Sequence, residues 1–129
     1  MDRYLFKKTF KTKTMGYYTQ FDLEANISYE QVEFHKKEIS KMVLKKYEDY
    51  EEEDYENATL FRHEVKWHKH EKDMRKYSKK YPNVVFKLMG VGEGDGMNID
   101  VWHKYFLNGK MQICKGEIVF DEYNKFKLE

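Results

Sequence analysis

Apolar and polar residues alternate in two stretches of the chain, residues 17–27 and 59–67, which predicts two β-strands that each bury one face. The apolar-rich residues 84–91 predict a third strand. In the first stretch, the face expected to be buried carries Tyr17, Thr19, Phe21, Leu23 and Ala25. In the second stretch, one face carries Phe61, His63, Val65 and Trp67, and the opposite face carries Leu60, Arg62, Glu64 and Lys66.

Two helices are expected between these strands. The first runs from about residue 29 to about residue 47, because apolar residues recur there at helical spacing. Ser28 and Gln31 have the spacing of a capping box at its start. The second helix fits residues 69–81, with acidic residues near its beginning and lysines near its end, and Pro82 stops it.

Asn108-Gly109 is the dipeptide that best supplies the two positive φ angles of a type I′ turn. It predicts a hairpin between residues 99–107 and 110–120. A two-residue loop also fixes the register. The expected partners are Leu107 with Lys110, Phe106 with Met111, Tyr105 with Gln112, His103 with Cys114, and Trp102 with Lys115.

This order of elements predicts an α+β protein, in a ferredoxin-like arrangement of four to five antiparallel strands with both helices on one face of the sheet. The 129 residues suit one domain, residues 1–129. Within it we expect a basic N-terminal arm over residues 1–14 and an acidic loop over residues 48–57.

The balance of charge argues against a general nucleic-acid binder or a membrane-surface protein, because 24 Lys and Arg nearly cancel 23 Asp and Glu. The single cysteine, Cys114, fits a reducing compartment. The first residues contain no apolar core of a signal peptide, and no apolar run is long enough to span a membrane. The sequence therefore predicts a cytoplasmic protein without a membrane partner.

The charged arm and the acidic loop each have two interpretations. Each is either a solvated segment, which we favour, or a binding surface. As a binding surface, the basic arm would bind a phosphate or an acidic partner, and the acidic loop would mimic nucleic acid and bind a protein that normally binds nucleic acid. The candidate partner-binding residues of the acidic loop are Glu51, Glu52, Glu53 and Asp54.

Catalysis, metal binding and cofactor binding have little support in the residues. The glycines of residues 90–96 are followed by a strand pattern rather than by the helix that a phosphate-binding loop needs. His103 and Cys114 are expected to be neighbours, but no third and fourth ligand stand at a recognisable zinc spacing. No nucleophile with its base, and no pair of carboxylates in an apolar context, is evident. We therefore expect no catalytic residues, no metal, no cofactor and no enzyme activity.

The most distinctive expected surface is one face of the hairpin. If the helices cover the face with Val101 and Tyr105, the other face is open to partners. The alternatives are that the two faces are reversed, or that residues 4–6 of the arm cover this one. The candidate partner-binding residues there are Trp102, Lys104, Phe106, Met111, Ile113 and Lys115.

Several motifs in the second half of the chain resemble the small ferredoxin-like domain of the YubB type, found in plasmid and bacteriophage proteins of Gram-positive hosts. They are Val65-Lys66-Trp67-His68, Tyr81-Pro82-Asn83-Val84-Val85-Phe86, Gly90-Val91-Gly92-Glu93-Gly94, and Asp100-Val101-Trp102 followed by Tyr105-Phe106 and Gly109-Lys110. The resemblance implies a ferredoxin-like fold and an origin on a mobile element, and it implies no activity. Residues 97–99 depart from the family as an insertion.

Two functional hypotheses follow. The first is a non-enzymatic binding protein of phage or mobile-element origin that engages a host protein, for example as an anti-CRISPR-like inhibitor of a defence nuclease. The alternative is a module that binds single-stranded nucleic acid through the aromatic and lysine side chains of the hairpin face. A homodimer is a further possibility, since an uncovered aromatic sheet face is often buried between two copies.

Overall fold

The computed structural model describes residues 18–45, 58–94 and 98–129. The basic arm over residues 1–14 and the acidic residues Glu51, Glu52, Glu53 and Asp54 lie outside this part of the chain. The described elements, in chain order, are β1 (Thr19–Ala25), α1 (Tyr29–Leu44), β2 (Ala58–Val65), α2 (His70–Lys80), β3 (Phe86–Val91), β4 (Val101–Leu107), β5 (Lys110–Lys115) and the short 3₁₀ helix η1 (Lys125–Lys127).

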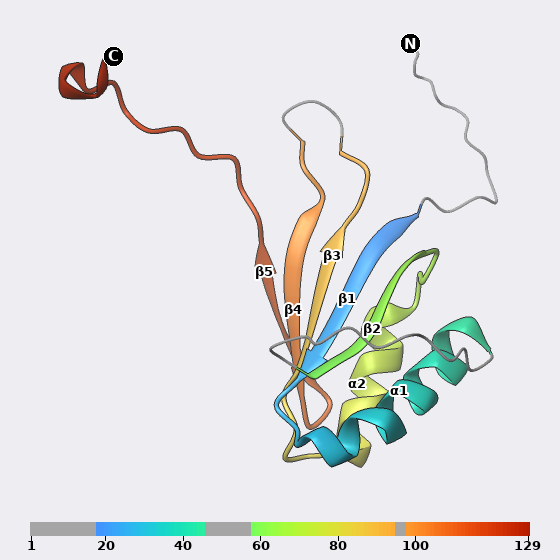
Figure 1. The fold of residues 1–129 in the computed structure, drawn as a ribbon. Helices are drawn as coiled ribbons and strands as arrows, with labels where there is room; N and C mark the ends of the chain where they lie inside the picture. Colours follow the sequence, from blue (N-terminus) through green and yellow to red (C-terminus); the bar gives the residue numbers. More distant parts are fainter. Residues whose placement is uncertain (1–17, 46–57, 95–97) are drawn as a thin grey trace, which may run out of the picture.

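The five strands form one sheet in the order β2-β1-β3-β4-β5, in which every neighbouring pair is antiparallel. Both α-helices lie on the same side of the sheet, α1 against β2 and α2 against β4 and β5 (Figure 1). The α+β class, the antiparallel sheet and the two helices on one face are thus as expected. The strand order does not identify a ferredoxin-like fold, because α1 joins two adjacent antiparallel strands rather than two parallel ones.

The core lies between the sheet and the helices. Alternate residues of the three central strands point into it, among them Leu23 of β1, Leu88 of β3 and Phe106 of β4, which are fully buried. Ile39 of α1 and Met74 of α2 meet them from the other layer. Burial of each such side chain stabilises the fold by roughly 1.5–3 kcal/mol, so this layer holds the helices on the sheet.

An irregularity in β2 changes one expected position. The pairing of β1 with β2 shifts register between Leu23 and Glu24, which indicates a β-bulge opposite these residues. As a result Leu60 and Phe61 are both buried, although strict alternation places Leu60 on the polar face. The prediction that Leu60 and Phe61 lie on opposite faces is therefore wrong, because the extra residue of the bulge changes the direction of the Leu60 side chain.

The hairpin of β4 and β5 has the predicted turn and register. Asn108 and Gly109 have φ angles of 49° and 81°, and all five predicted cross-strand pairs are present. The turn also contacts α2: Gly109 N donates to the hydroxyl of Ser78 at 2.8 Å, and Arg75 Nε donates to the carbonyl of Gly109 at 3.0 Å. These bonds fix the tip of the hairpin to the helix.

Several elements are shorter than the sequence predicts. Helix α1 ends at Leu44, followed by Lys45 in the left-handed conformation at a φ of 59°. Strand β5 ends at Lys115 rather than at residue 120, because β4 begins only at Val101 and offers no partner beyond it. Neither α-helix in the described ranges is long and apolar enough to cross a membrane.

Candidate functional site

The structure reverses the two faces of the hairpin relative to the first alternative of the sequence analysis. Trp102, Lys104 and Phe106 stand opposite Gly90, Leu88 and Phe86 of β3, on the side that the helices cover. Phe106 is fully buried, and Lys104 is 7% exposed. Alternation along a strand assigns residues to two faces but does not show which face the helices cover. In this structure the covered face of β4 is the one that contacts the buried residues of β3 and α2. The proposed surface of Trp102, Lys104 and Phe106 is therefore part of the core.

The other three residues expected on this surface belong to β5, the edge strand. Met111 is half-buried, whereas Ile113 and Lys115 are exposed, because α2 makes few contacts with this strand. These β5 positions remain accessible to a partner. The six hairpin residues named as one surface thus divide into a buried group on β4 and an accessible group on β5.

Lys104 lies at the centre of a buried polar cluster under the N-terminal end of α2. Its Nζ is 2.6 Å from Glu71 Oε2 and 2.7 Å from His70 Nε2, and it lies 4.0 Å from the centroid of the Trp102 ring. The hydrogen bond from Lys104 lowers the pKa of the Glu71 carboxyl. A buried ammonium group is tolerated only when it is paired and hydrogen-bonded, and this cluster supplies both.

The hydrogen bonds of His70 define its tautomer. Its Nδ1 is 2.9 Å from the carbonyl oxygen of Trp67, which can only accept, so Nδ1 carries the proton and Nε2 accepts from Lys104. Burial, and then the neighbouring Lys104 charge, lowers the pKa of His70 despite the favourable bond to Trp67. The imidazole also stacks on Trp102, at 4.9 Å between ring centroids. The cluster thus holds a neutral histidine against a charged lysine.

Another histidine, which is fully buried, joins the two helices. His35 of α1 is 2% exposed, and its Nδ1 is 2.5 Å from the hydroxyl of Tyr77 of α2. Burial, followed by the neighbouring Tyr81, raises the pKa of the Tyr77 hydroxyl, which therefore stays protonated and donates to His35. Burial lowers the pKa of His35, so its ring is neutral in the folded protein. His35 is thus closed to a substrate, whereas His70 is half-buried and is held by its hydrogen bonds and by the stacked Trp102 ring.

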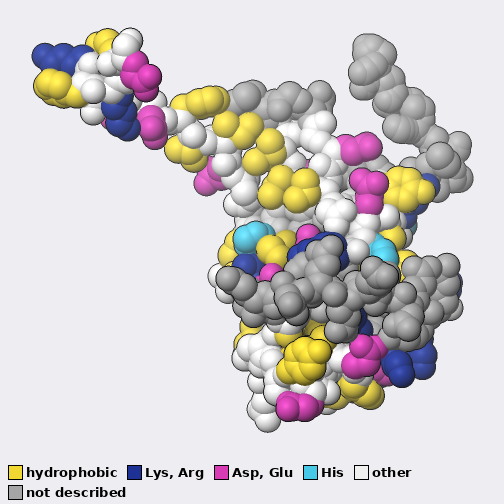
Figure 2. Space-filling model, viewed as in Figure 1, with side chains coloured by type: hydrophobic (Ala, Val, Ile, Leu, Met, Phe, Trp, Pro, Cys, Tyr) yellow, Lys and Arg dark blue, Asp and Glu magenta, His cyan; other side chains and the backbone are white. Residues whose placement is uncertain are grey.

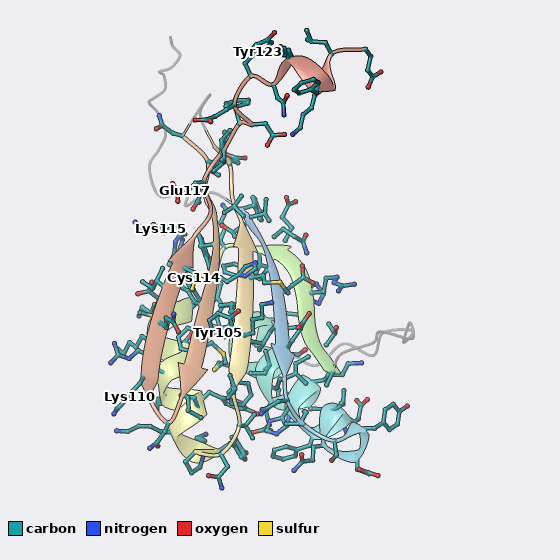
Figure 3. The ribbon with its side chains drawn as sticks, turned by 90° about the vertical axis from the view of Figure 1, so that its left-hand side faces the viewer. Tyr105, Lys110, Cys114, Lys115, Glu117 and Tyr123 are labelled. Carbon is teal, nitrogen blue, oxygen red and sulfur yellow. The ribbon has the colours of Figure 1, made fainter. Side chains whose placement is uncertain are left out.

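The helix-free face of the sheet is the largest surface that the described elements leave without a covering layer. Figure 3 views the sheet from this side, with Tyr105 and Cys114 on neighbouring strands and the helices behind. Val91 is 52% exposed and Leu107 is 44% exposed on this face. On the part formed by β3 and β4, Met89, Val91, Val101, His103, Tyr105 and Leu107 make up what is here called the apolar patch. Lys87 borders it, with its Nζ 5.9 Å from the centroid of the Tyr105 ring.

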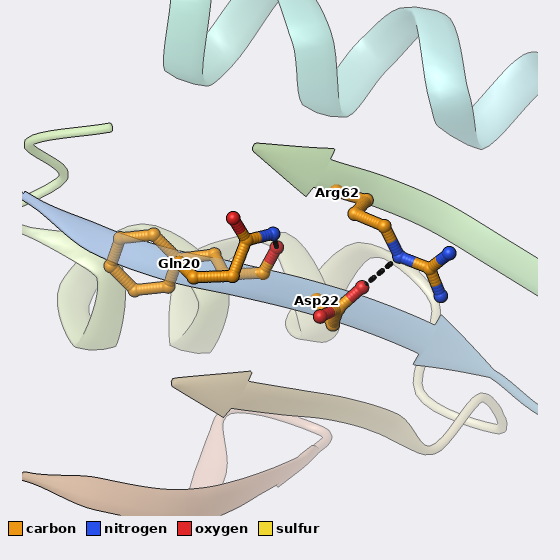
Figure 4. Close-up of polar contacts among 4 residues, drawn as sticks. Gln20, Asp22 and Arg62 are labelled. Atoms are coloured by element: carbon orange, nitrogen blue, oxygen red, sulfur yellow. Dashed lines mark hydrogen bonds and ion pairs between the residues drawn. The ribbon is translucent and has the colours of Figure 1, made fainter. Parts of the chain in front are cut away.

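The β1–β2 side of the same face is charged. Asp22 forms an ion pair with Arg62 across the two strands (Figure 4). Beside them, Gln20 Nε2 donates to the carbonyl of Phe21 at 3.4 Å. Glu24 and Glu64 also lie on this face, since they alternate with the buried residues of their strands. The helix-free face therefore joins an apolar patch to a border of mixed charge.

A second candidate surface is the C-terminal segment, residues 116–129. It leaves the sheet at the end of β5 and runs away from the body (Figure 1). Apolar side chains gather along it (Figure 2), and Val119, Phe120, Tyr123 and Phe126 are each at least 75% exposed. The predicted hairpin includes residues 116–120, so the exposed segment is not evident from the sequence. Only the start of β4 at Val101 shows that residues 117–120 have no partner on that strand.

The described residues contain no group of three His, Cys, Asp or Glu side chains placed to hold a metal ion. His103 and Cys114 are cross-strand neighbours, as the register predicts. Comparison of the chain with protein-family models, with curated proteins and with solved structures gives no match. The function is therefore argued from the geometry of the residues.

Proposed function

We propose that this protein is a non-enzymatic binding protein that contacts a partner protein through the helix-free face of its sheet. The observation that carries the proposal is the apolar patch on β3 and β4, where Tyr105, Val91 and Leu107 are accessible on a rigid sheet. A central aromatic and aliphatic group with a polar border is the usual composition of a protein interface. The ion pair of Asp22 and Arg62 lies in that border.

The charges on this face favour a protein over a nucleic acid, because they are of both signs. The acidic residues Asp22, Glu24 and Glu64 share the face with the cationic residues Arg62, Lys87 and Lys110. A protein accepts such a mixture, whereas nucleic acid favours an excess of positive charge. The alternative hypothesis, single-stranded nucleic acid, depended on base stacking by Trp102 and Phe106 beside Lys104. Phe106 and Lys104 lie in the core and Trp102 stacks on His70, which leaves this alternative with little geometric support.

A narrower proposal concerns the identity of the partner. The sequence resemblance to the YubB-type phage and plasmid domain, together with the acidic residues of positions 48–56, supports a cytoplasmic protein of mobile-element origin. Its partner would then be a host defence protein, such as a nuclease whose nucleic-acid groove accepts an acidic segment. A ferredoxin-like relationship for the sheet belongs to the same proposal.

The test is affinity capture from lysate of candidate host cells, with the wild type and with the double variant Tyr105→Ser, Leu107→Ser. Both positions face solvent at least in part, so the variant is expected to fold. We expect the wild type to retain one protein in a stoichiometric amount, and the variant to bind that purified protein at least about tenfold more weakly.

The matched control is Lys76→Glu, which changes an exposed residue on α2, on the opposite side of the molecule. It is expected to bind like the wild type, and circular dichroism should show the same fold for all three proteins. Equal binding by the double variant and the wild type would exclude the helix-free face as the interface. Capture of an oligonucleotide in place of a protein would support the alternative.

A further inference from the structure

The outer edge of β5 is an open edge of the sheet. In the order β2-β1-β3-β4-β5, strand β5 has a neighbour on one side only. Gly116 N donates to the carbonyl of Val101 at 2.7 Å, so the backbone groups of Gly116 point toward β4. Because these groups alternate in direction along a strand, those of Lys115, Ile113 and Met111 point outward. They form a row of donors and acceptors that no strand in the described ranges uses and that another strand can pair with.

The segment that follows β5 has the properties of such a strand. Residues 116–124 continue in an extended path, and no described strand pairs with residues 117–124. Val119 is 81% exposed and Phe120 is 75% exposed, which is unusual for large apolar side chains next to a sheet. Ile118, Val119 and Phe120 also favour the β conformation. The segment thus has the composition of a strand, and none of the described strands pairs with it.

The charges of the segment complement those of β5. Glu117, Asp121 and Glu122 make residues 117–122 acidic, whereas β5 begins and ends with a lysine, Lys110 and Lys115. Figure 3 shows these two lysines at the ends of the strand and Glu117 just beyond it. The other open edge, on β2, is a poorer acceptor, because the chain before β2 is rich in Glu and Asp and would repel the segment.

We infer that two copies of this chain pair through residues 110–122, as one antiparallel ribbon around a two-fold axis at Gly116. In this dimer the segment of each copy extends the sheet of the other at its β5 edge. The backbone groups that point outward from one copy must form hydrogen bonds with those that point outward from the other copy. These groups belong to odd-numbered residues, so each odd-numbered residue must stand opposite an odd-numbered residue. The register centred on Gly116 meets it, with Lys115 opposite Glu117, Ile113 opposite Val119 and Met111 opposite Asp121.

The same register places the remaining residues favourably. Lys110 stands opposite Glu122, and Cys114 stands opposite Ile118, so both lysines of β5 face a carboxylate of the other copy. A centre moved by one residue toward β5 puts Lys115 opposite Lys115, and a centre moved by one residue the other way puts Glu117 opposite Glu117. Like charges placed directly opposite one another are unfavourable. When residues 110–122 of two copies run in opposite directions, lysines therefore stand opposite carboxylates. This match favours a second copy of the chain over an unrelated partner.

The inference goes beyond the proposed function and does not depend on it, because the ribbon uses the β5 edge and not the apolar patch. A two-fold axis perpendicular to the sheet places the helix-free faces of both copies on the same side of the dimer. A partner would then meet two apolar patches side by side.

The first test is the mass in solution. Sedimentation equilibrium of the wild type is expected to give twice the 15.9 kDa of one chain. Lys115→Glu is expected to raise the dissociation constant roughly tenfold, since it places like charges opposite each other at two symmetric positions. The double variant Lys115→Glu, Glu117→Lys exchanges the two charges and should restore the dimer. A wild type that stays monomeric at the highest soluble concentration would overturn the inference.

The second test fixes the register with a disulfide. Under mild oxidation, Ile118→Cys should link to Cys114 of the other copy, because opposite residues in such a ribbon lie about 4.5–5.5 Å apart at Cα, which a disulfide can span. The matched control Val119→Cys lies on the other face of the ribbon and should link far less. Removal of Cys114 by Cys114→Ser should abolish the Ile118→Cys link. Equal linking by both cysteine variants, or a link that does not need Cys114, would refute the register.

Discussion

At the scale of single residues, two buried serines show opposite uses of the same side chain. The Ser78 hydroxyl accepts from Gly109 N at 2.8 Å and donates to the carbonyl of Arg75 at 2.9 Å. The hydroxyl of Ser40, equally buried on α1, has no hydrogen-bond partner among the described residues. A buried hydroxyl stabilises a fold only where its hydrogen bonds are made.

These serines give a matched pair of variants. Ser78→Ala leaves the N–H of Gly109 without its acceptor and should lower the free energy of unfolding by about 1–3 kcal/mol. Ser40→Ala removes a polar atom that makes no bond, so the free energy of unfolding should stay the same or rise. Urea denaturation of both variants measures the difference. A larger loss for Ser40→Ala than for Ser78→Ala would contradict this account of the turn.

At the scale of elements, the contact between β3 and β4 depends on a glycine. A Cβ atom built on Gly90 would lie 2.2 Å from Cζ2 of Trp102, so the tryptophan ring occupies the space that a side chain would fill. The ring in turn stacks on His70 of α2 and lies beneath the ammonium group of Lys104. Gly90 therefore permits the cluster that joins this part of the sheet to the second helix.

Gly90→Ala is expected to displace Trp102 and to lower the free energy of unfolding by roughly 1–3 kcal/mol, the usual cost of overpacking. The tryptophan fluorescence should also change, since the indole loses its stacked position. Val91→Ala is the control, because Val91 is the next residue of the same strand and is 52% exposed on the other face. A wild-type spectrum and stability for Gly90→Ala would show that the ring does not need this space.

At the scale of the whole molecule, the buried His35 and the half-buried His70 link folding to pH. Burial is the main cause that lowers the pKa of both His35 and His70 below the ordinary value of 6.5. Below pH 6.5 the unfolded chain therefore binds more protons at these residues than the folded protein does. The stability that the neutral rings provide is complete above that pH and is lost as the pH falls through it.

We expect the free energy of unfolding, measured by urea denaturation, to be lower at pH 5.5 than at pH 7.5. The interval stays above the ordinary titration range of Glu71, whose lowered pKa matters only in stronger acid. His35→Gln and His70→Gln should each reduce the dependence on pH, and the double variant should reduce it further. An unchanged slope in both single variants would mean that other groups control the effect.

The amino-acid sequence by itself determined the local features of this protein. Asn108 and Gly109 tolerate positive φ angles, so they fixed the turn and every pair of the hairpin. Periodicity located each described strand and α-helix to within a few residues, apart from the end of β5, and did not indicate η1. Propensity, capping and the spacing of apolar residues act over short distances, which is why they locate such elements.

Only the tertiary structure decided which face of the hairpin is buried, where β5 ends and how the strands are ordered. Phe106 and Tyr105 are adjacent in the chain and comparable in apolar character, and nothing local tells which of them meets the helices. The choice came from contacts with Phe86, Leu88 and Met74, which are distant in the sequence. Burial is a property of the assembled layers, and the candidate binding surfaces, as the parts left uncovered, follow from it.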